Sequence, residues 1–183
     1  MLRSVSLMRL DLIRDDGVVL IVRATKKLRD RIGPPDLCGG EQSTTVLGEW
    51  YATRFGWRPD VLLLVNESTL LPVLLPLAPA ATALSRAVDR IAVAMATHGT
   101  SAAIIAAELE QMRTHRIGTT ANRGVVGIMS EFSHLADAYR DRGRQPNLDE
   151  LAARLATTPC SPLYRTHISP DRAFTALVHT IPE

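Results

Sequence analysis

The stretch from Val61 to Leu84 is the most apolar part of the chain, and it constrains the fold more than any other. Polar residues interrupt it at 66–69, and prolines follow at positions 72, 76 and 79. A membrane-spanning helix needs about 20 uninterrupted apolar residues, so this stretch predicts short buried strands instead. Pro72 predicts that the later strand lies at a sheet edge, because proline cannot donate a ladder hydrogen bond. An edge strand could accept a partner strand.

The rest of the chain predicts an α+β fold. β-branched and aromatic residues predict further strands at 18–23 and 49–55. In the second half, apolar residues recur at helical spacing. We therefore expect an antiparallel sheet of about four strands, with Ala-rich helices packed on one face. Residues 1–17 are expected to be an N-terminal extension, and residues 18–183 a single domain.

The charge balance identifies no single class of partner. The chain has 21 basic and 19 acidic residues, which gives a formal net charge of +2. A dedicated nucleic-acid binder usually has a clearer basic excess or a basic stripe. The two cysteines, Cys38 and Cys160, have the spacing of neither a zinc site nor a disulfide framework. Because the N-terminus also lacks a signal-peptide pattern, we expect a cytoplasmic protein that does not associate with membranes.

No catalytic constellation is evident, so we expect no catalytic residue, no metal site and no cofactor. The nucleophile elbow G-x-S-x-G does not occur. Glu131 and His134 form an E-x-x-H pair, but a di-iron bundle needs two such pairs and further glutamates. Cys38 stands in a Gly-rich segment and is expected to be an incidental surface thiol.

A first candidate binding cluster lies at a strand-to-helix transition in "VLIVRATKKLRDRIG". Thr25 is expected to cap the helix, and Lys26 and Lys27 follow in its first turn. Helix N-termini attract anions, so the lysines could bind phosphate. The alternative is a solvent-exposed basic face that Arg29 and Arg31 complete.

A second basic cluster precedes a long predicted helix. Its members are Arg113, His115, Arg116 and Arg123, with Thr119, Thr120 and Asn122 as hydroxyl and amide donors. Such a loop could hold a phosphate or a carboxylate. Alternatively, Thr120 or Asn122 caps the helix, and Arg123 pairs with an acid such as Glu49 or Glu108. The candidate binding residues from both clusters are Thr25, Lys26, Lys27, Arg116, Thr119 and Arg123.

Three aromatic residues, Trp50, Tyr51 and Trp57, lie close to Arg54 and Arg58 in the chain. Aromatic rings interleaved with arginines stack on bases in proteins that bind single strands. The same rings are among the few large residues available to the core, because aromatics make up only 4% of the chain. We expect two of the rings in the core, with Trp57 and Arg58 exposed at a turn.

A family resemblance rests on the segments "IVRATKKL", "LLLVNESTL", "TTANRGVVGIM" and "TPCSPL". They are similar to motifs of an uncharacterised bacterial family, a domain of unknown function, with an IR-x-TKKL strand-to-helix start and a T-x-x-R-x-V-x-G-x-M helix entry. The resemblance spans about Val19 to Val178. Members often have Cys at the position of Ala24 and Ser at that of Gly124, which argues against catalysis by either. The resemblance implies a fold and a domain boundary, but no activity.

We therefore expect a bacterial accessory protein without catalytic activity. It would bind a macromolecule, either a protein or a nucleic acid, through its basic surface or its edge strand. The alternative is an enzyme that acts on a phosphorylated or other anionic small molecule. A concave pocket at Lys26, Arg116 and Arg123 would favour the enzyme, and a convex surface would favour the binding module.

Overall fold

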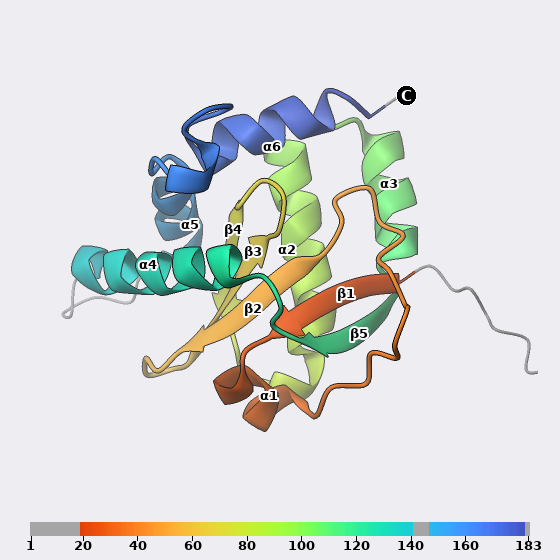
Figure 1. Cartoon of the computed structure of the whole chain (residues 1–183), viewed down its shortest axis with the longest axis vertical. Coiled ribbons are helices and arrows are strands. Elements are labelled where there is room, and N and C mark those ends of the chain that lie inside the picture. The colour runs from red at the N-terminus through yellow and green to blue at the C-terminus, as the bar shows by residue number, and fades with distance from the viewer. Residues whose placement is uncertain (1–18, 141–146, 182–183) are drawn as a thin grey trace, which may run out of the picture.

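The computed structural model describes residues 19–140 and 147–181. Five strands in this part of the chain form one sheet in the order β4-β3-β2-β1-β5 (Figure 1). The strands are β1 (Val19–Ala24), β2 (Trp50–Phe55), β3 (Val61–Asn66), β4 (Pro72–Pro76) and β5 (Thr114–Thr119). The helices of the described ranges are α1 (Lys26–Ile32), α2 (Ala83–Thr97), α3 (Ala102–Gln111), α4 (Arg123–Tyr139), α5 (Leu148–Ala156) and α6 (Pro170–Val178). The expected extension, residues 1–17, lies outside the described residues.

The α+β prediction is confirmed, but the expected antiparallel sheet is wrong. The sheet is mixed, and it has five strands rather than about four. β1 pairs in parallel with both β2 and β5, whereas β2, β3 and β4 pair antiparallel. The helix α1 lies between β1 and β2 in the chain, and a crossover of this kind returns the chain in the same direction. β5 carries His115 and Arg116 and has no apolar run, so its sequence predicts only a brief extended stretch and no place in the sheet.

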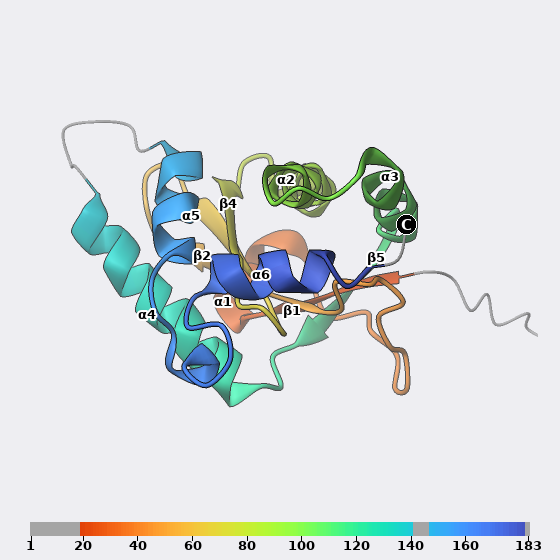
Figure 2. The ribbon, with the colours of Figure 1, turned by 90° about the horizontal axis from the view of Figure 1, so that it is seen from above.

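Helices cover both faces of the sheet rather than the one expected (Figure 2). In β3, Leu62 and Leu64 point into a core shared with α2, whereas Leu63 packs in a second core with Phe132 of α4. A strand buried on both faces has a continuous apolar sequence, and "VLLLV" is one. Among the described residues, no helix is both long and apolar enough to cross a membrane.

The outer edge of β4 is poorly suited to strand pairing. Pro72 lies on an edge strand, as its sequence predicts. Asn66 N donates a hydrogen bond to Leu71 O, so these two residues form a hydrogen-bonded pair of the antiparallel β3–β4 ladder. Along β4, every second residue after Leu71 is again hydrogen-bonded to β3, and the residues between them are not. Pro72, Leu74 and Pro76 therefore direct their backbone groups away from β3. Two of these three residues lack an N–H, and α5 packs along the strand.

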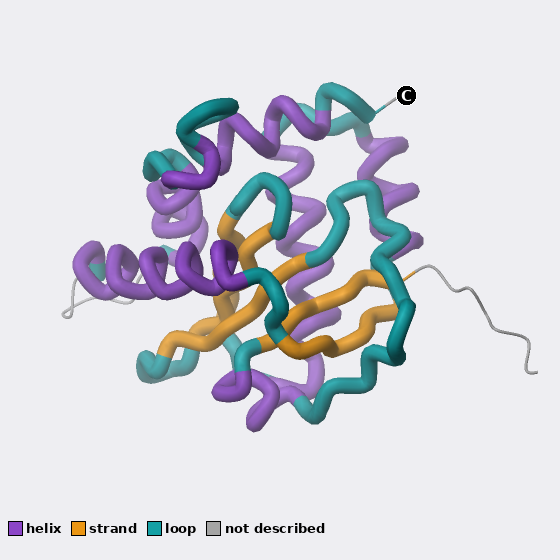
Figure 3. Tube along the Cα trace, viewed as in Figure 1, coloured by secondary structure: helices purple, strands orange, loops and turns teal. Residues whose placement is uncertain are grey.

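The opposite edge of the sheet, at β5, is covered by the long loop 33–49 (Figure 3). Ile117 O accepts hydrogen bonds from Asp36 N at 2.9 Å and Leu37 N at 3.1 Å. Ile117 N in turn donates to Asp36 Oδ1 at 2.6 Å. The loop therefore takes up backbone groups that an edge strand would otherwise leave unpaired.

Candidate functional site

The end of the second predicted cluster reaches the start of the first one at the carboxyl ends of β1 and β5. β1 and β5 are parallel neighbours, and their register pairs Ala24 with Thr119. Thr25 and Thr120 therefore continue from adjacent strand ends, close to α1 (Figure 1). From there the chain turns to opposite faces, because α1 packs with the α2 core and α4 with the other core. In open sheets, this divergence after parallel strands forms a crevice at which ligands bind.

Thr25 occupies the N-cap position of α1, but its side chain makes no capping hydrogen bond. Its Oγ1 lies 2.9 Å from Thr53 Oγ1 on β2 instead. Only its backbone serves the helix, since Thr25 O accepts from Leu28 N and Arg29 N at 3.0 Å. The interpretation of the Thr25 hydroxyl as a helix cap is therefore wrong, and this hydroxyl links the end of β1 to β2.

Lys26 and Lys27 extend into solvent. The Lys26 side chain is 82% exposed, and its Nζ lies 3.2 Å from Asp30 Oδ2 one helical turn later. Lys27 is also exposed, and its carbonyl accepts a hydrogen bond from Arg54 Nε at 3.0 Å. Exposed ion pairs contribute little to stability and exchange readily. The charge of both lysines is therefore accessible to a partner.

The residues of the second cluster are spread along β5 and the start of α4. Arg116 is partly buried, and its Nε lies 3.7 Å from Glu41 Oε1. Thr119 and Arg123 are exposed. Thr119 ends β5, whereas Arg116 pairs with Ile21 in the middle of β1. The structure thus brings Thr119 to the first cluster and leaves Arg116 farther along the sheet.

The cap of α4 follows one of the two alternatives for this segment. Asn122 Oδ1 accepts hydrogen bonds from two backbone N–H groups of the first turn, at 3.0 and 3.3 Å. The expected pairing of Arg123 with Glu49 or Glu108 is wrong. Glu49 binds Arg23. Glu108 is buried and accepts from two backbone N–H groups of the loop before β2, both at 3.0 Å.

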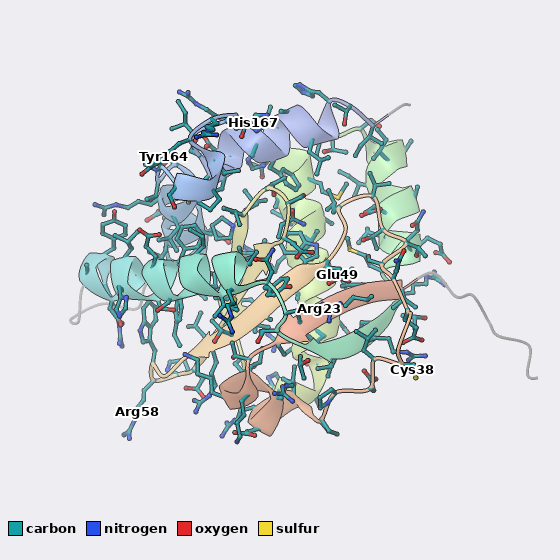
Figure 4. All side chains as sticks on the ribbon, in the orientation of Figure 1. Arg23, Cys38, Glu49, Arg58, Tyr164 and His167 are labelled. Carbon is teal, nitrogen blue, oxygen red and sulfur yellow. The ribbon has the colours of Figure 1, made fainter. Side chains whose placement is uncertain are left out.

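A polar cluster that the sequence did not predict lies on the face of the sheet beside α4 (Figure 4). Arg23 Nε lies 2.5 Å from Glu49 Oε2, and Nη2 lies 3.1 Å from Oε1, which makes a bidentate ion pair. The hydrogen bond to Glu49 raises the pKa of Arg23. Arg23 Nη1 also donates to Thr119 O at 3.4 Å. Gly118 lies beside this group, and a Cβ there would be 3.0 Å from Leu37 Cδ2 and 3.4 Å from Arg23 Nη1.

Tyr51 extends this cluster toward α4. Its hydroxyl donates to Glu67 Oε1 at 3.3 Å and accepts from Asn122 N at 2.9 Å. Burial raises the pKa of Tyr51, and the negative charge of Glu67 adds to this effect. Together these contacts hold the start of α4 against β2. The available sequence signal was Arg23, the charged residue within an otherwise apolar strand.

The aromatic residues of segment 50–57 are all buried, with exposed fractions of 8% or less. The expectation that Trp57 is exposed is therefore wrong. Its Nε1 donates to Asp137 Oδ1 at 2.6 Å, and the Arg140 guanidinium lies 4.7 Å from the ring centre. Arg58 is exposed at the turn, as expected (Figure 4). These rings pack in the two cores.

Metal-ligating residues in the described ranges do not gather into a metal site, and the two cysteines lie in different surroundings. Among these residues, no group of three or more His, Cys, Asp and Glu side chains could hold a metal ion. Cys160 is buried, and burial raises the pKa of its thiol to about 11. Because the thiolate is the nucleophile, Cys160 is poorly suited to covalent chemistry. Cys38 is exposed on the loop before β2.

Three cavities in the described part of the chain lie away from the ends of β1 and β5. One of about 260 Å³ lies between β4, α2 and α5. A second, of about 340 Å³, lies beside the same elements, near Arg86. A third, of about 370 Å³, lies between Arg31 at the end of α1 and the β2–β3 turn. Lys26, Arg116 and Arg123 line none of these three cavities.

Comparison with known proteins gives one family whose model covers both basic clusters. A family model described as a domain of unknown function, DUF6933, matches residues 21–173. Neither the comparison with curated proteins nor the comparison with solved structures gives a match. The matched range extends from β1 into α6, so the candidate binding residues all lie within it.

Proposed function

Because the chain belongs to this domain family, whose description assigns no activity, we propose a function from the site itself: non-catalytic binding of nucleic acid through its phosphate backbone. The proposed basic surface consists of Lys26, Lys27 and Arg31 on α1, with Thr119 at the end of β5, the strand next to β1. The observation that supports it most is the exposure of these three cationic side chains on one short helix.

The charge density of α1 supports the proposal. Four of its seven residues are basic, and Asp30 is its only acid. The side chains of Lys26 and Arg31 are 82% and 56% exposed. Exposed cations that neutralise phosphates release counterions from the nucleic acid, and this release favours binding. The overall charge of +2 conceals this local excess.

Two other modes of binding have less support. Pro72 and Pro76 remove two of the three outward-facing N–H donors of β4, and α5 covers that edge. A partner strand would therefore find few backbone groups to pair with. An enzyme acting on a small anion would be expected to enclose it, whereas Lys26 and Arg123 are exposed and line none of the three cavities.

The test is the binding of fluorescently labelled oligonucleotides, followed by anisotropy at low and moderate salt. We expect affinity to fall by about ten-fold or more between about 50 and about 200 mM salt, because phosphate contacts are lost steeply with salt. The double substitution Lys26→Glu with Lys27→Glu should weaken binding at low salt by about ten-fold or more.

A matched control is Arg165→Glu with Arg172→Glu, which changes the net charge equally. Both arginines are exposed, near α6 at the opposite end of the molecule from α1 (Figure 1). This control should bind like the wild type. Equal weakening in both double variants, or no effect of the lysine changes, would contradict the proposal. A stoichiometric protein retained from lysate without nucleic acid would favour a protein-binding module instead.

A further inference from the structure

The cavity of about 370 Å³ lies beside the basic surface, because Arg31 belongs to both. Arg31 of α1 lines one side, and residues 57–60 of the β2–β3 turn line another. Leu77, Ala78 and Ala80, from the segment before α2, complete it. Ligand-binding cavities in proteins begin at about 300 Å³, so this one can accept a small organic group.

The polar part of the cavity combines one carboxylate with arginines. Asp60 Oδ2 lies 3.0 Å from Arg54 Nη1 and 4.0 Å from Arg31 Nη2. Among the described residues, no hydrogen bond engages Asp60 Oδ1. Arg58 is exposed and points outward from the turn (Figure 4). The rim is therefore positively charged, and one carboxylate oxygen within it can still accept a hydrogen bond.

The remaining lining is apolar and well held in place. Leu77 is 1% exposed, and Trp57 is 8% exposed. Trp57 also lines the cavity, and the hydrogen bond from its Nε1 to Asp137 of α4 fixes the position of this residue. Ala78 and Ala80 are small, so they leave space between Trp57 and Arg31 of α1. An apolar slot with one acceptor and a cationic rim matches a flat base that carries an amino group and a phosphate.

We propose that this cavity binds one unpaired nucleotide. The base occupies the apolar slot, its amino group donates to Asp60 Oδ1, and its phosphate lies against Arg58 and Arg31. The inference rests on the proposed function, because it makes the basic surface a site for single strands. In a duplex the bases are stacked and paired, and placing one in a pocket costs the energy of extruding it. Single strands present their bases without this cost.

The experiment compares single-stranded and duplex oligonucleotides of one sequence, with the full chain. We expect the single strand to bind about ten-fold more tightly at equal salt. A gain of this size is typical of one base that is held against a protein side chain. Ala80→Leu fills the cavity without changing charge, and it should remove this difference while leaving duplex binding unchanged. Ala81→Leu is the matched control, because Ala81 is exposed and does not line the cavity. Thermal unfolding of both variants verifies that they fold.

Calorimetry with nucleoside 5′-monophosphates and with inorganic phosphate separates this inference from the proposed function. Nucleotide binding that Ala80→Leu abolishes supports the cavity even if no oligonucleotide binds, and in that case the proposed surface fails. Equal affinity for single strand and duplex, with no effect of Ala80→Leu, would overturn the proposal that the cavity binds a nucleotide. The proposal that the basic surface binds nucleic acid would be unaffected. Competition by inorganic phosphate as strong as that by the nucleotides would overturn base recognition.

Discussion

Arg23 and Lys27 are four residues apart in the chain, yet their charges have opposite surroundings. The Arg23 side chain is 21% exposed, and Glu49 holds it in a bidentate pair. Lys27 is exposed, and the described contact of this residue is made by its backbone. A partly buried charge must be paired, because leaving it unpaired costs several kcal/mol. An exposed charge carries no such requirement, so it is available for binding.

The two regions therefore differ in what a substitution should change. Around Arg23, hydrogen bonds link β1, β2, β5 and the start of α4, so substitutions there should change stability. On α1, the lysines contact mainly solvent, so substitutions there should change binding.

Glu49→Gln should have the largest effect on stability. It keeps the shape of the side chain but leaves Arg23, at 21% exposed, without its opposite charge. We expect the free energy of unfolding to fall by about 2 kcal/mol. Urea denaturation measures the change. The matched control is Glu41→Gln, whose carboxylate lies 3.7 Å from the more exposed Arg116 and should matter little. A loss as large in the control would remove the distinction between the two pairs.

Tyr51→Phe should have a smaller effect. It removes the hydroxyl that accepts from Asn122 N and donates to Glu67, and it leaves those groups without this partner. We expect a loss of about 1 kcal/mol in the free energy of unfolding at neutral pH. Hydrogen exchange at the start of α4 should increase as well. If exchange there stays unchanged, Tyr51 does not hold the helix in place.

The pH dependence of the same variant provides an independent test. Burial raises the pKa of Tyr51 in the folded protein, while the unfolded chain titrates near about 10. The folded state therefore holds this proton more tightly, and its stability falls as the pH rises above that value. Phenylalanine has no proton to lose, so the stability difference between wild type and Tyr51→Phe should narrow above about pH 10. If the stability difference between wild type and Tyr51→Phe stays constant across this pH range, the pKa of Tyr51 is not raised in the folded protein.

Lys26→Glu with Lys27→Glu should have the smallest effect on stability. Acidic residues in the first turn of a helix interact well with its dipole, which offsets the lost contact of Lys26 with Asp30. We expect the Tm to stay within about 2 °C of the wild type or to rise slightly. Calorimetry checks this. A large decrease would show that the exposed lysines stabilise the fold, and weaker nucleic-acid binding could then reflect unfolding.

The features that the sequence predicts correctly depend on neighbouring residues. Pro72 identifies an edge strand, because its missing N–H is a property of the residue itself. Asn122 caps α4 with the side chain expected of it. The predictions that are wrong concern residues whose partners lie far away in the sequence. Thr25 bonds to Thr53 rather than to its own helix, and Trp57 is buried by residues of α4 and its end.

The sequence by itself determined the buried strand β3, the amphipathic helices, the Asn122 cap of α4 and the basic character of α1. These features follow from spacing and residue type within a few positions of the chain. The tertiary structure alone decided that β5 pairs with β1, that helices cover both faces, and that Arg23 and Glu49 form a pair. Such contacts join residues far apart in sequence, and several pairings of the same segments would satisfy the local patterns equally. Only the packing of the whole chain selects among them.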